Sequence, residues 1–355
     1  MISNGSIVFS ENHFVRIQSC FVQHYNTCDV YRRFCDNVGF SPASLERLED
    51  IAEIPLIPTQ MFKSCDILSV PAESIVKICT SSGTNGSISR VFRDAKSLQS
   101  FTMGTAQRVT ENLSNKASEF SMLCLGPQKD EAKDLWIAYI MSLMGGITAK
   151  QSYYVRDNKF LLMDLIEDLK SAGQSQEKVA LIGPPMFFVY LFGALKNANT
   201  KLRLHPESFV ITMGGWKKDE DKALSRSEIE ENILDVLGLA STQFRDGYGA
   251  VELNTVVFDC VNKHMHLPDW TVAIAKDPDT LRPLHYGEEG ILSFIDTSAS
   301  SYPCFILTED FGTVYPGGLC GCGVSGDYIA VSRRINKVES KGCALKMNNT
   351  EVVSA

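Results

Sequence analysis

The sequence lacks several features that would assign it to a common class. No window approaches the roughly 20 consecutive apolar residues that a membrane-spanning helix needs. The first residues, MISNGSIVFSENHF, carry no basic stretch followed by a sustained apolar run, so they are not typical of a secretory signal. No basic run is present and the net charge is −8, which argues against a nucleic-acid partner. We therefore expect a cytoplasmic protein without a membrane span.

Disulfide bonds are not expected either. The chain has 11 cysteines, an odd number, spread from Cys20 to Cys343. At 355 residues it is far larger than the small secreted domains that depend on disulfides. We expect reduced thiols, with any special cysteine serving a metal or a reaction. The 44% of hydrophobic residues are enough for the core of one large α/β domain or of two ordinary domains.

The order of apolar patterns predicts an α/β fold with helices packed on mixed β-sheets. Residues 1–60 are expected to be helical, because DVYRRFCDNVGF and SLERLEDIAEI carry apolar residues three and four positions apart. From residue 95 to 240, apolar strands such as KVALIGP alternate with helical stretches such as LLMDLIEDLKSAG. Beyond residue 285 the pieces are short and β-rich. A boundary is expected at 332–336, so that a large domain (1–331) precedes a short, truncated C-terminal segment (332–355).

A polar loop follows the first predicted strand. It comprises Thr80, Ser81, Ser82, Gly83, Thr84, Asn85 and Gly86. Hydroxyl and backbone N–H groups on a loop made flexible by two glycines can wrap a triphosphate. The loop is not a Walker A motif, because no Gly-Lys-Ser/Thr follows at the required spacing. Taken alone, it is equally compatible with an ordinary solvated turn.

Two further motifs are suited to a nucleotide. The apolar strand FVITM ends in Gly214 and Gly215, which would let the backbone lie against a flat base. The motif Tyr248-Gly249-Ala-Val-Glu252 supplies an aromatic face for a purine and a carboxylate for a metal-bound phosphate. Each motif taken alone also has an ordinary structural explanation. Glycines are common at the ends of strands, and the second motif could be a surface turn with a tyrosine in the core.

The order of these motifs, followed by LTEDFG around Asp310, resembles the adenylate-forming superfamily of acyl-CoA synthetases. The segments IPLIPTQMFKS, TSSGTNGSISRVFRD, YGAVE and ESKGCALKM are most similar to the LuxE acyl-protein synthetases, with phenylacetate-CoA ligases as relatives. The resemblance covers the chain from about residue 50 to the end. It implies the adenylate-forming fold for the large domain.

The resemblance also implies how ATP and Mg²⁺ are bound. Residues 81–86 would hold the phosphates, Tyr248 would stack on adenine, Glu252 would bind Mg²⁺ and Asp310 would bind the ribose. The chain departs from the family pattern at Asn85, where a threonine is usual. It also stops where acyl-CoA ligases continue into a C-terminal domain of roughly a hundred residues. The late lysine that assists adenylation in those enzymes has no evident counterpart.

Cysteine and histidine spacing indicates a second site. Cys260 and His266 lie six positions apart, and Cys320-Gly-Cys322-Gly is suited to turning two thiolates onto one ion. Three cysteines and one histidine are an accepted ligand set for structural Zn²⁺, although such residues also pack in cores. Phenylacetate-CoA ligases carry similar segments, so the resemblance favours zinc. His264 is the alternative ligand.

Cys343 is the candidate acyl acceptor. A thiolate can attack an acyl-adenylate and form a thioester that is still reactive. One cysteine near a terminus is commonly only a free thiol, but the resemblance to LuxE proteins marks this one as the acylated residue. In larger relatives the segment matching 332–346 holds the hinge and a glycine-bearing loop that swings over the active site, so Cys343 would take the place of CoA.

Together these features predict an acyl-protein synthetase. A carboxylic acid such as a fatty acid would react with ATP to give acyl-AMP, Cys343 would take the acyl group, and the resemblance implies delivery to an acyl reductase partner. An acyl- or aryl-CoA ligase is the first alternative. A zinc-containing interaction subunit with a vestigial nucleotide pocket is the second. The acyl group is not defined, since residues 185–192 would either line an acyl pocket or form a buried helix face.

Overall fold

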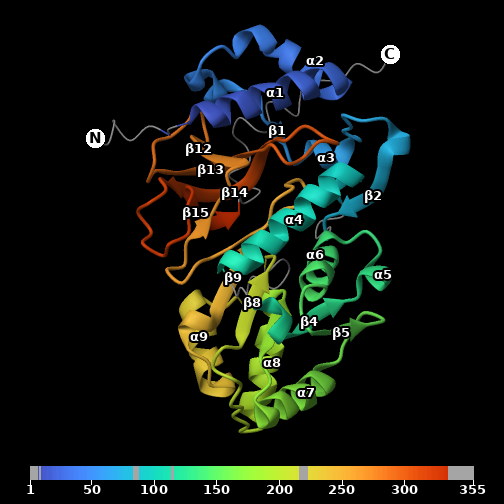
Figure 1. Cartoon of the computed structure of the whole chain (residues 1–355), viewed down its shortest axis with the longest axis vertical. Helices are drawn as coiled ribbons and strands as arrows, with labels where there is room; N and C mark the ends of the chain where they lie inside the picture. The colour runs from blue at the N-terminus through green and yellow to red at the C-terminus, as the bar shows by residue number, and fades with distance from the viewer. Residues whose placement is uncertain (1–6, 8, 83–87, 113–115, 216–222, 335–355) are drawn as a thin grey trace.

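The structure, a computed structural model, describes residues 7, 9–82, 88–112, 116–215 and 223–334. Its strands form two large sheets, one above the other in Figure 1, and the long helix α4 (Ala95–Asn112) runs beside their junction. None of the helices in the described ranges combines the length and the hydropathy that a bilayer crossing requires.

The N-terminal segment is α-helical in its first part only. Helix α1 begins after Ser10, whose hydroxyl accepts the His13 N–H at 3.1 Å. The stretch SLERLEDIAEI forms 3₁₀ turns rather than the α-helix that its apolar spacing predicts. Ile54 precedes Pro55, and a residue before proline disfavours the α conformation, so a helix cannot continue there. The elements of this part are α1 (Glu11–Thr27), α2 (Asp29–Asn37), the 3₁₀ turns Pro42–Ser44, Leu48–Glu53 and Ala72–Ser74, β1 (Ile57–Pro58) and α3 (Met61–Ser64).

The lower sheet has seven strands in the order β10-β9-β8-β7-β4-β5-β6. Its five central strands are parallel, and short antiparallel strands flank them. This mixed sheet with covering helices confirms the predicted α/β class. The strands are β4 (Ser121–Pro127), β5 (Lys150–Arg156), β6 (Lys159–Phe160), β7 (Val179–Gly183), β8 (Phe209–Met213), β9 (Phe244–Tyr248) and β10 (Val257–Phe258).

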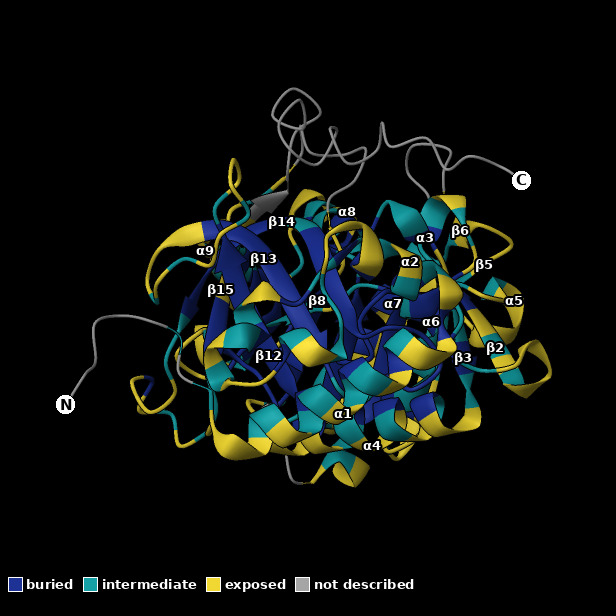
Figure 2. Cartoon of the chain, turned by 90° about the horizontal axis from the view of Figure 1, so that it is seen from above, coloured by how far each residue is buried: buried dark blue, intermediate teal, exposed yellow. Residues whose placement is uncertain are grey.

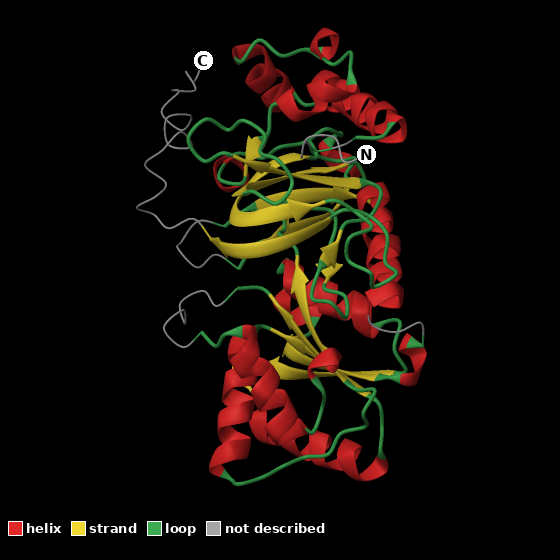
Figure 3. Cartoon of the chain, turned by 90° about the vertical axis from the view of Figure 1, so that its left-hand side faces the viewer, coloured by secondary structure: helices red, strands yellow, loops and turns green. Residues whose placement is uncertain are grey.

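Both faces of this sheet are buried, as expected for parallel strands. Along β4, Met122 and Cys124 enter a core with α4 and α6, whereas Leu123 and Leu125 enter a second core with α7 and α8. Figure 3 shows the helices packed around the strands of this lower layer. The helices after α4 are α5 (Lys129–Ala132), α6 (Trp136–Gly145), α7 (Leu162–Ser175), α8 (Pro185–Asn197) and α9 (Arg226–Asn232), the last continued by a π-helical turn (Ile233–Leu237).

Helix α8 decides between the two interpretations of residues 185–192. Phe188, Leu191 and Phe192 are buried in the second core, where they pack against α7 and the sheet. One side of the apolar stretch is therefore a buried helix face, whereas Tyr190 is exposed.

The upper sheet has six strands, with β11-β15-β14-β13-β12 antiparallel and β1 parallel to β14. Helices α1 and α2 cover it, because Phe21 and Tyr31 both pack on the Phe305 ring, with centroids 5.7 and 5.5 Å away. Figure 2 shows β13 and β14 as a buried layer. These strands are β11 (Met265–His266), β12 (Thr271–Lys276), β13 (Glu289–Asp296), β14 (Phe305–Tyr315) and β15 (Tyr328–Arg334); a separate hairpin joins β2 (Ile75–Thr80) to β3 (Arg90–Asp94).

Candidate active site and metal centre

The predicted adenosine-binding residues lie at the carboxyl ends of parallel strands. Strand β8 continues into Gly214, and β9 ends at Tyr248. The two strands pair with Met213 opposite Gly247, so Gly214 and Tyr248 are neighbours at one edge of the sheet. Ligands of open α/β sheets bind at this edge. Gly214 has φ +81°, a conformation that only glycine adopts readily.

Tyr248 connects the two sheets. Its hydroxyl donates to Oδ2 of Asp310 on β14 at 2.9 Å, and its ring stacks on Phe294 of β13 with centroids 5.8 Å apart. Asp310 is buried, whereas Gly249, which follows Tyr248 in the chain, is exposed. Two side chains that were assigned to adenine and ribose from separate motifs therefore meet where the two sheets join.

The base of the predicted phosphate loop is closed by two serines. The Ser81 N–H donates to Ser89 O at 3.1 Å, and Ser81 Oγ accepts the Ser89 N–H at 3.0 Å. Ser82 is exposed. The remaining predicted phosphate-binding residues lie outside the described residues: Gly83, Thr84, Asn85 and Gly86.

The start of α6 links this loop to the sheet edge. Thr80 donates its N–H to Asp134 O at 2.7 Å and pairs with Leu135. One turn further, Ile137 lies so close to Gly214 that a Cβ on that glycine would be 3.4 Å from its Cδ1. Thr80, where the loop begins, and Gly214 are thus both in contact with residues at the start of α6.

Glu252, the predicted Mg²⁺ ligand, lies in the irregular segment between β9 and β10 and is only 6% exposed. The carbonyls on either side of it, those of Val251 and Leu253, accept hydrogen bonds from Arg93. Motif reasoning missed Arg93. The available signal was an arginine at an inward-facing position of the strand that follows the phosphate loop, where Val91 is also buried.

Asp246 is a second residue that motif reasoning missed. Its Oδ1 accepts the Thr212 hydroxyl at 2.6 Å and the Gly247 N–H at 3.1 Å, just before Tyr248. Burial raises the pKa of Asp246 to about 6, although the Thr212 hydrogen bond acts in the opposite direction. The signal was its place within FRDGYG, which showed a carboxylate on the apolar strand that leads into the motif.

The four predicted metal ligands come together in the structure. The ligand atoms of Cys260, His266, Cys320 and Cys322 all lie within 4.8 Å of one another. Cys260 precedes β11, His266 is on β11, and the other two cysteines are on the turn before β15. The antiparallel pairing of β11 with β15 places His266 opposite Tyr328. It thereby holds the Cys260–His266 segment next to the turn that carries Cys320 and Cys322.

The surroundings of the cluster fit a structural metal. The N–H groups of Asn262 and Val324 each donate to a cluster sulfur at 3.3 Å. His266 Nδ1 lies 3.2 Å from the carbonyl of Gly326, which leaves Nε2 directed toward Cys322 Sγ, 3.3 Å away. A Cys₃His set with oriented ligands suits tetrahedral Zn²⁺.

His264, the alternative ligand, lies beside the cluster rather than among its four members. Its Nδ1 is 3.1 Å from Cys320 Sγ, and its ring stacks on Tyr328. Burial acts to raise the pKa of Cys320, but hydrogen bonds with His264 and His266 outweigh it and lower the pKa to about 5. A thiolate, the form that binds metals, is thereby favoured.

The predicted acceptor Cys343 lies outside the described residues. The strand that leads toward it is described as far as Arg334, and this residue pairs with Asp310 on β14. The described part of β15 therefore ends next to the Tyr248–Asp310 contact. Strand β15 runs past Ser332, so the boundary expected at 332–336 stays a prediction.

Comparisons with known proteins identify the family. The family described as "Acyl-protein synthetase, LuxE" matches residues 9–351. The chain belongs to the LuxE acyl-protein synthetase family. This LuxE-family chain is an enzyme of the ligase class and is 32% identical to the long-chain-fatty-acid–luciferin-component ligase of Aliivibrio fischeri, over 94% of this chain and 87% of that one. A phenylacetate-coenzyme A ligase of Thermus thermophilus is 21% identical over 87% of this chain and 66% of its own length.

A solved structure confirms the adenylate-forming fold of the LuxE-family chain. It is 2-hydroxyisobutyryl-CoA ligase in an open conformation, in complex with 2-HIB-AMP and CoA. The TM-score is 0.70 at 16% identity, and the match covers 91% of this chain and 74% of that one. At this identity the likeness concerns the fold alone.

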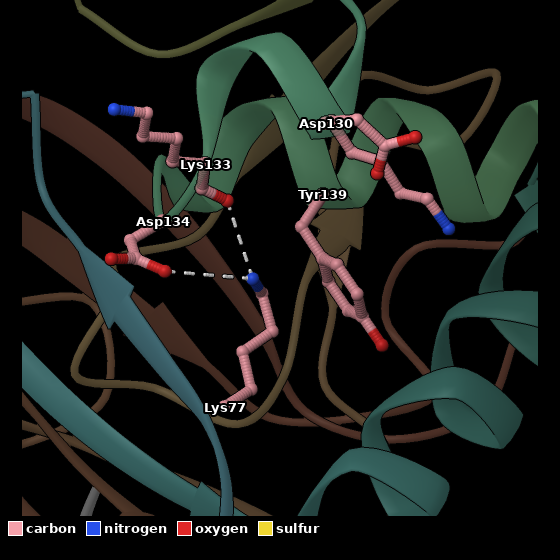
Figure 4. Close-up of a pocket in the computed structure, with 6 residues that line it drawn as sticks. Lys77, Asp130, Lys133, Asp134 and Tyr139 are labelled. Atoms are coloured by element: carbon pink, nitrogen blue, oxygen red, sulfur yellow. Dashed lines mark hydrogen bonds and ion pairs between the residues drawn. The ribbon is translucent and has the colours of Figure 1, made fainter.

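A pocket of about 390 Å³ lies on the inner side of β2, and it contains none of the predicted site residues (Figure 4). Lys77 on β2 donates to Lys133 O at 3.3 Å and lies 3.9 Å from the Asp134 carboxylate. Its ammonium group is also 5.3 Å from the centre of the Tyr139 ring. Lys77, the lysine at the centre of this pocket, is therefore held by groups of the protein itself.

Proposed function

We propose that this acyl-protein synthetase activates a long-chain fatty acid with ATP and then carries the acyl group on Cys343. The observation that carries the proposal is the Tyr248–Asp310 contact beside Gly214, at the carboxyl ends of the parallel strands. The fatty acid is taken from the name of the Aliivibrio fischeri relative. The acyl-adenylate is consistent with the 2-HIB-AMP that the 2-hydroxyisobutyryl-CoA ligase holds on a similar fold.

In the first step, a carboxylate oxygen of the acid attacks the α-phosphorus of ATP, and the bond to pyrophosphate breaks. The Tyr248 ring would cover adenine, and the carboxylate of Asp310 would accept hydrogen bonds from the ribose hydroxyls. Glu252 would hold the Mg²⁺ that neutralises the phosphates, and the loop from Thr80 to Gly86 would hold the phosphates themselves. The products are acyl-AMP and pyrophosphate.

In the second step, the thiolate of Cys343 attacks the acyl carbonyl carbon, AMP leaves and a thioester forms; the thiol proton passes to solvent. Cys343 follows nine positions after Arg334, which pairs with Asp310. A chain of that length spans at most about 30 Å, so covalent geometry allows the sulfur to reach the adenylate. The thioester would then be passed to an acyl reductase.

We also propose that Cys260, His266, Cys320 and Cys322 hold one structural Zn²⁺. Four protein ligands leave no open position for an activated water, so the ion would stabilise the contact between β11 and β15 without taking part in the reaction.

ATP–pyrophosphate exchange with a series of fatty acids tests the activation step. Exchange that depends on a long-chain acid is the expected result. No exchange with any carboxylate would favour a vestigial nucleotide pocket. Formation of acyl-CoA from added CoA, with no acylated protein, would favour an acyl-CoA ligase instead.

A further inference from the structure

The segment that carries Glu252 needs hydrogen-bond donors from elsewhere. Val251 and Leu253 are buried and lie outside strands and helices, so ladder hydrogen bonds are not available to their carbonyls. A buried carbonyl without a donor costs free energy comparable to a lost hydrogen bond. Whatever supplies these donors also fixes the backbone on both sides of Glu252.

Arg93 supplies them. Its Nη2 donates to Val251 O at 2.7 Å and to Leu253 O at 2.8 Å, the carbonyls that flank Glu252. Its Nε donates to Asn254 Oδ1 at 3.0 Å. One planar guanidinium therefore holds three acceptors within residues 251–254, which the single ammonium of a lysine cannot do in the same geometry.

The guanidinium is fully buried and is stacked on aromatic rings. Its carbon lies 3.8 Å from the centre of the Trp136 ring and 5.4 Å from that of Tyr302. In the part of the chain that the structure describes, no carboxylate lies within salt-bridge distance of Arg93. Carbonyl dipoles and ring faces therefore stabilise its charge.

The position of Arg93 connects the separate motifs of the site. It lies on β3, the strand that follows the phosphate loop, and Trp136 is the first residue of α6, whose neighbours contact Thr80 and Gly214. A shift of this one side chain would move the Glu252 segment relative to Thr80 and to the strand end at Gly214.

We propose that Arg93 is a positioning residue for the Mg²⁺–ATP complex: it holds the backbone on both sides of Glu252 in place without contacting ATP itself. The proposal rests on the proposed adenylating function. Because misplacement of a reacting group by about 1 Å can lower a rate a hundredfold, a small rotation of the Glu252 backbone should weaken use of Mg²⁺–ATP while leaving acid binding nearly unchanged.

The test compares Arg93→Lys with Arg108→Lys in the full chain. Arg108 is a matched control, because it is also a buried arginine, but its guanidinium pairs with Glu111 and faces the Trp270 ring. For Arg93→Lys we expect the Mg²⁺–ATP concentration at half-maximal exchange to rise about tenfold, whereas the KM for the acid changes less than about twofold. Arg108→Lys should change neither. A folded Arg93→Lys protein with wild-type Mg²⁺–ATP dependence, or with equal loss in both substrates, would overturn the proposal.

Trp136→Phe covers the case in which Arg93→Lys does not fold. It keeps an aromatic face but reduces the area under the guanidinium, and we expect a shift in Mg²⁺–ATP dependence of about twofold to threefold in the same direction. No shift would count against the proposal. Calorimetric binding of Mg²⁺–ATP is measured in parallel because it needs no acid. If the wild type binds Mg²⁺–ATP but shows no exchange, the proposed function is contradicted, but Arg93 can still be tested by comparing the Mg²⁺–ATP affinities of the variants. If the wild type binds no Mg²⁺–ATP, both proposals are overturned.

Discussion

The Cys/His cluster draws its four ligands from residues 260–266 and from the turn before β15, which one strand pair holds together, whereas the candidate adenylate site draws its side chains from both sheets. In the cluster, backbone N–H groups and a neighbouring carbonyl already orient the ligands. In the adenylate site, Tyr248 and Asp310 come from different sheets, and the Glu252 segment depends on Arg93 from the hairpin.

Because the two sites are built differently, loss of a ligand or side chain should have a different effect in each. A metal bound in the cluster would join residues 260–266 to the turn before β15, so loss of the metal should lower the free energy of unfolding. The adenylate site lies on strands that large cores already stabilise, so loss of a single side chain there should lower the rate and leave the fold intact.

The largest expected effect is removal of the metal. Purified protein should contain one zinc per chain, and Cys320→Ser should lower the free energy of unfolding by on the order of several kcal/mol, seen as a melting temperature lower by at least about 5 °C. Cys65→Ser is the matched control, since Cys65 is a half-buried thiol at the end of α3, far from the cluster in sequence. Well under one zinc per chain, with an unchanged melting temperature in chelator, would refute the metal site.

The next effect is on catalysis. Glu252→Gln should lower ATP–pyrophosphate exchange about tenfold or more, because a neutral amide binds Mg²⁺ more weakly; tenfold corresponds to about 1.4 kcal/mol of transition-state stabilisation. Glu230→Gln removes a partly buried carboxylate that pairs with Arg226 and Lys263 and should leave exchange unchanged. Normal exchange in folded Glu252→Gln would exclude Glu252 from the site.

A smaller effect is expected from Tyr248→Phe. The ring remains for adenine, but the hydrogen bond to Asp310 is lost, so the KM for ATP should rise about fivefold, equivalent to about 1 kcal/mol. Tyr286→Phe is a matched control because the Tyr286 hydroxyl donates to the Asp327 carboxylate at 2.7 Å. If both variants change the KM for ATP equally, the Tyr248–Asp310 contact has no special role in nucleotide binding.

The smallest effect concerns pH. Burial raises the pKa of Asp246 from 3.8 to about 6, so the folded protein binds this proton more tightly than the unfolded chain does. Protonation therefore favours folding, and the contribution of Asp246 to stability falls as the pH rises from about 4 to about 6. Asp246→Asn keeps an acceptor for Thr212 but cannot ionise. Its melting temperature should lack this part of the pH dependence; parallel curves for wild type and variant would contradict the assignment.

The sequence predicted the parts of the fold that have a strong period. Apolar segments predicted β7, β8 and α7 close to their observed bounds. The 3₁₀ turns at residues 42–53 were not predicted, because apolar spacing alone does not show how Pro42 and Pro55 restrict the backbone.

For the Cys/His cluster, local spacing indicated each half, Cys260 with His266 and Cys320 with Cys322, but not how the halves meet. Cys320 and Cys322 lie on one turn, and only one strand pairing brings them to Cys260 and His266. Arg93 could not be assigned, because its partners lie about 160 positions away and are backbone carbonyls, which carry no residue-type signal.

Intact-mass analysis after incubation with ATP, Mg²⁺ and a long-chain fatty acid tests the central claim most directly. Wild type should gain the mass of one acyl group less water, and hydroxylamine should remove it, because thioesters are labile to this reagent. Cys343→Ser should gain no such mass while its pyrophosphate exchange stays near normal, since adenylation precedes thiol attack. Equal hydroxylamine-labile acylation of Cys343→Ser, or a wild type that acylates added CoA and never itself, would contradict the account.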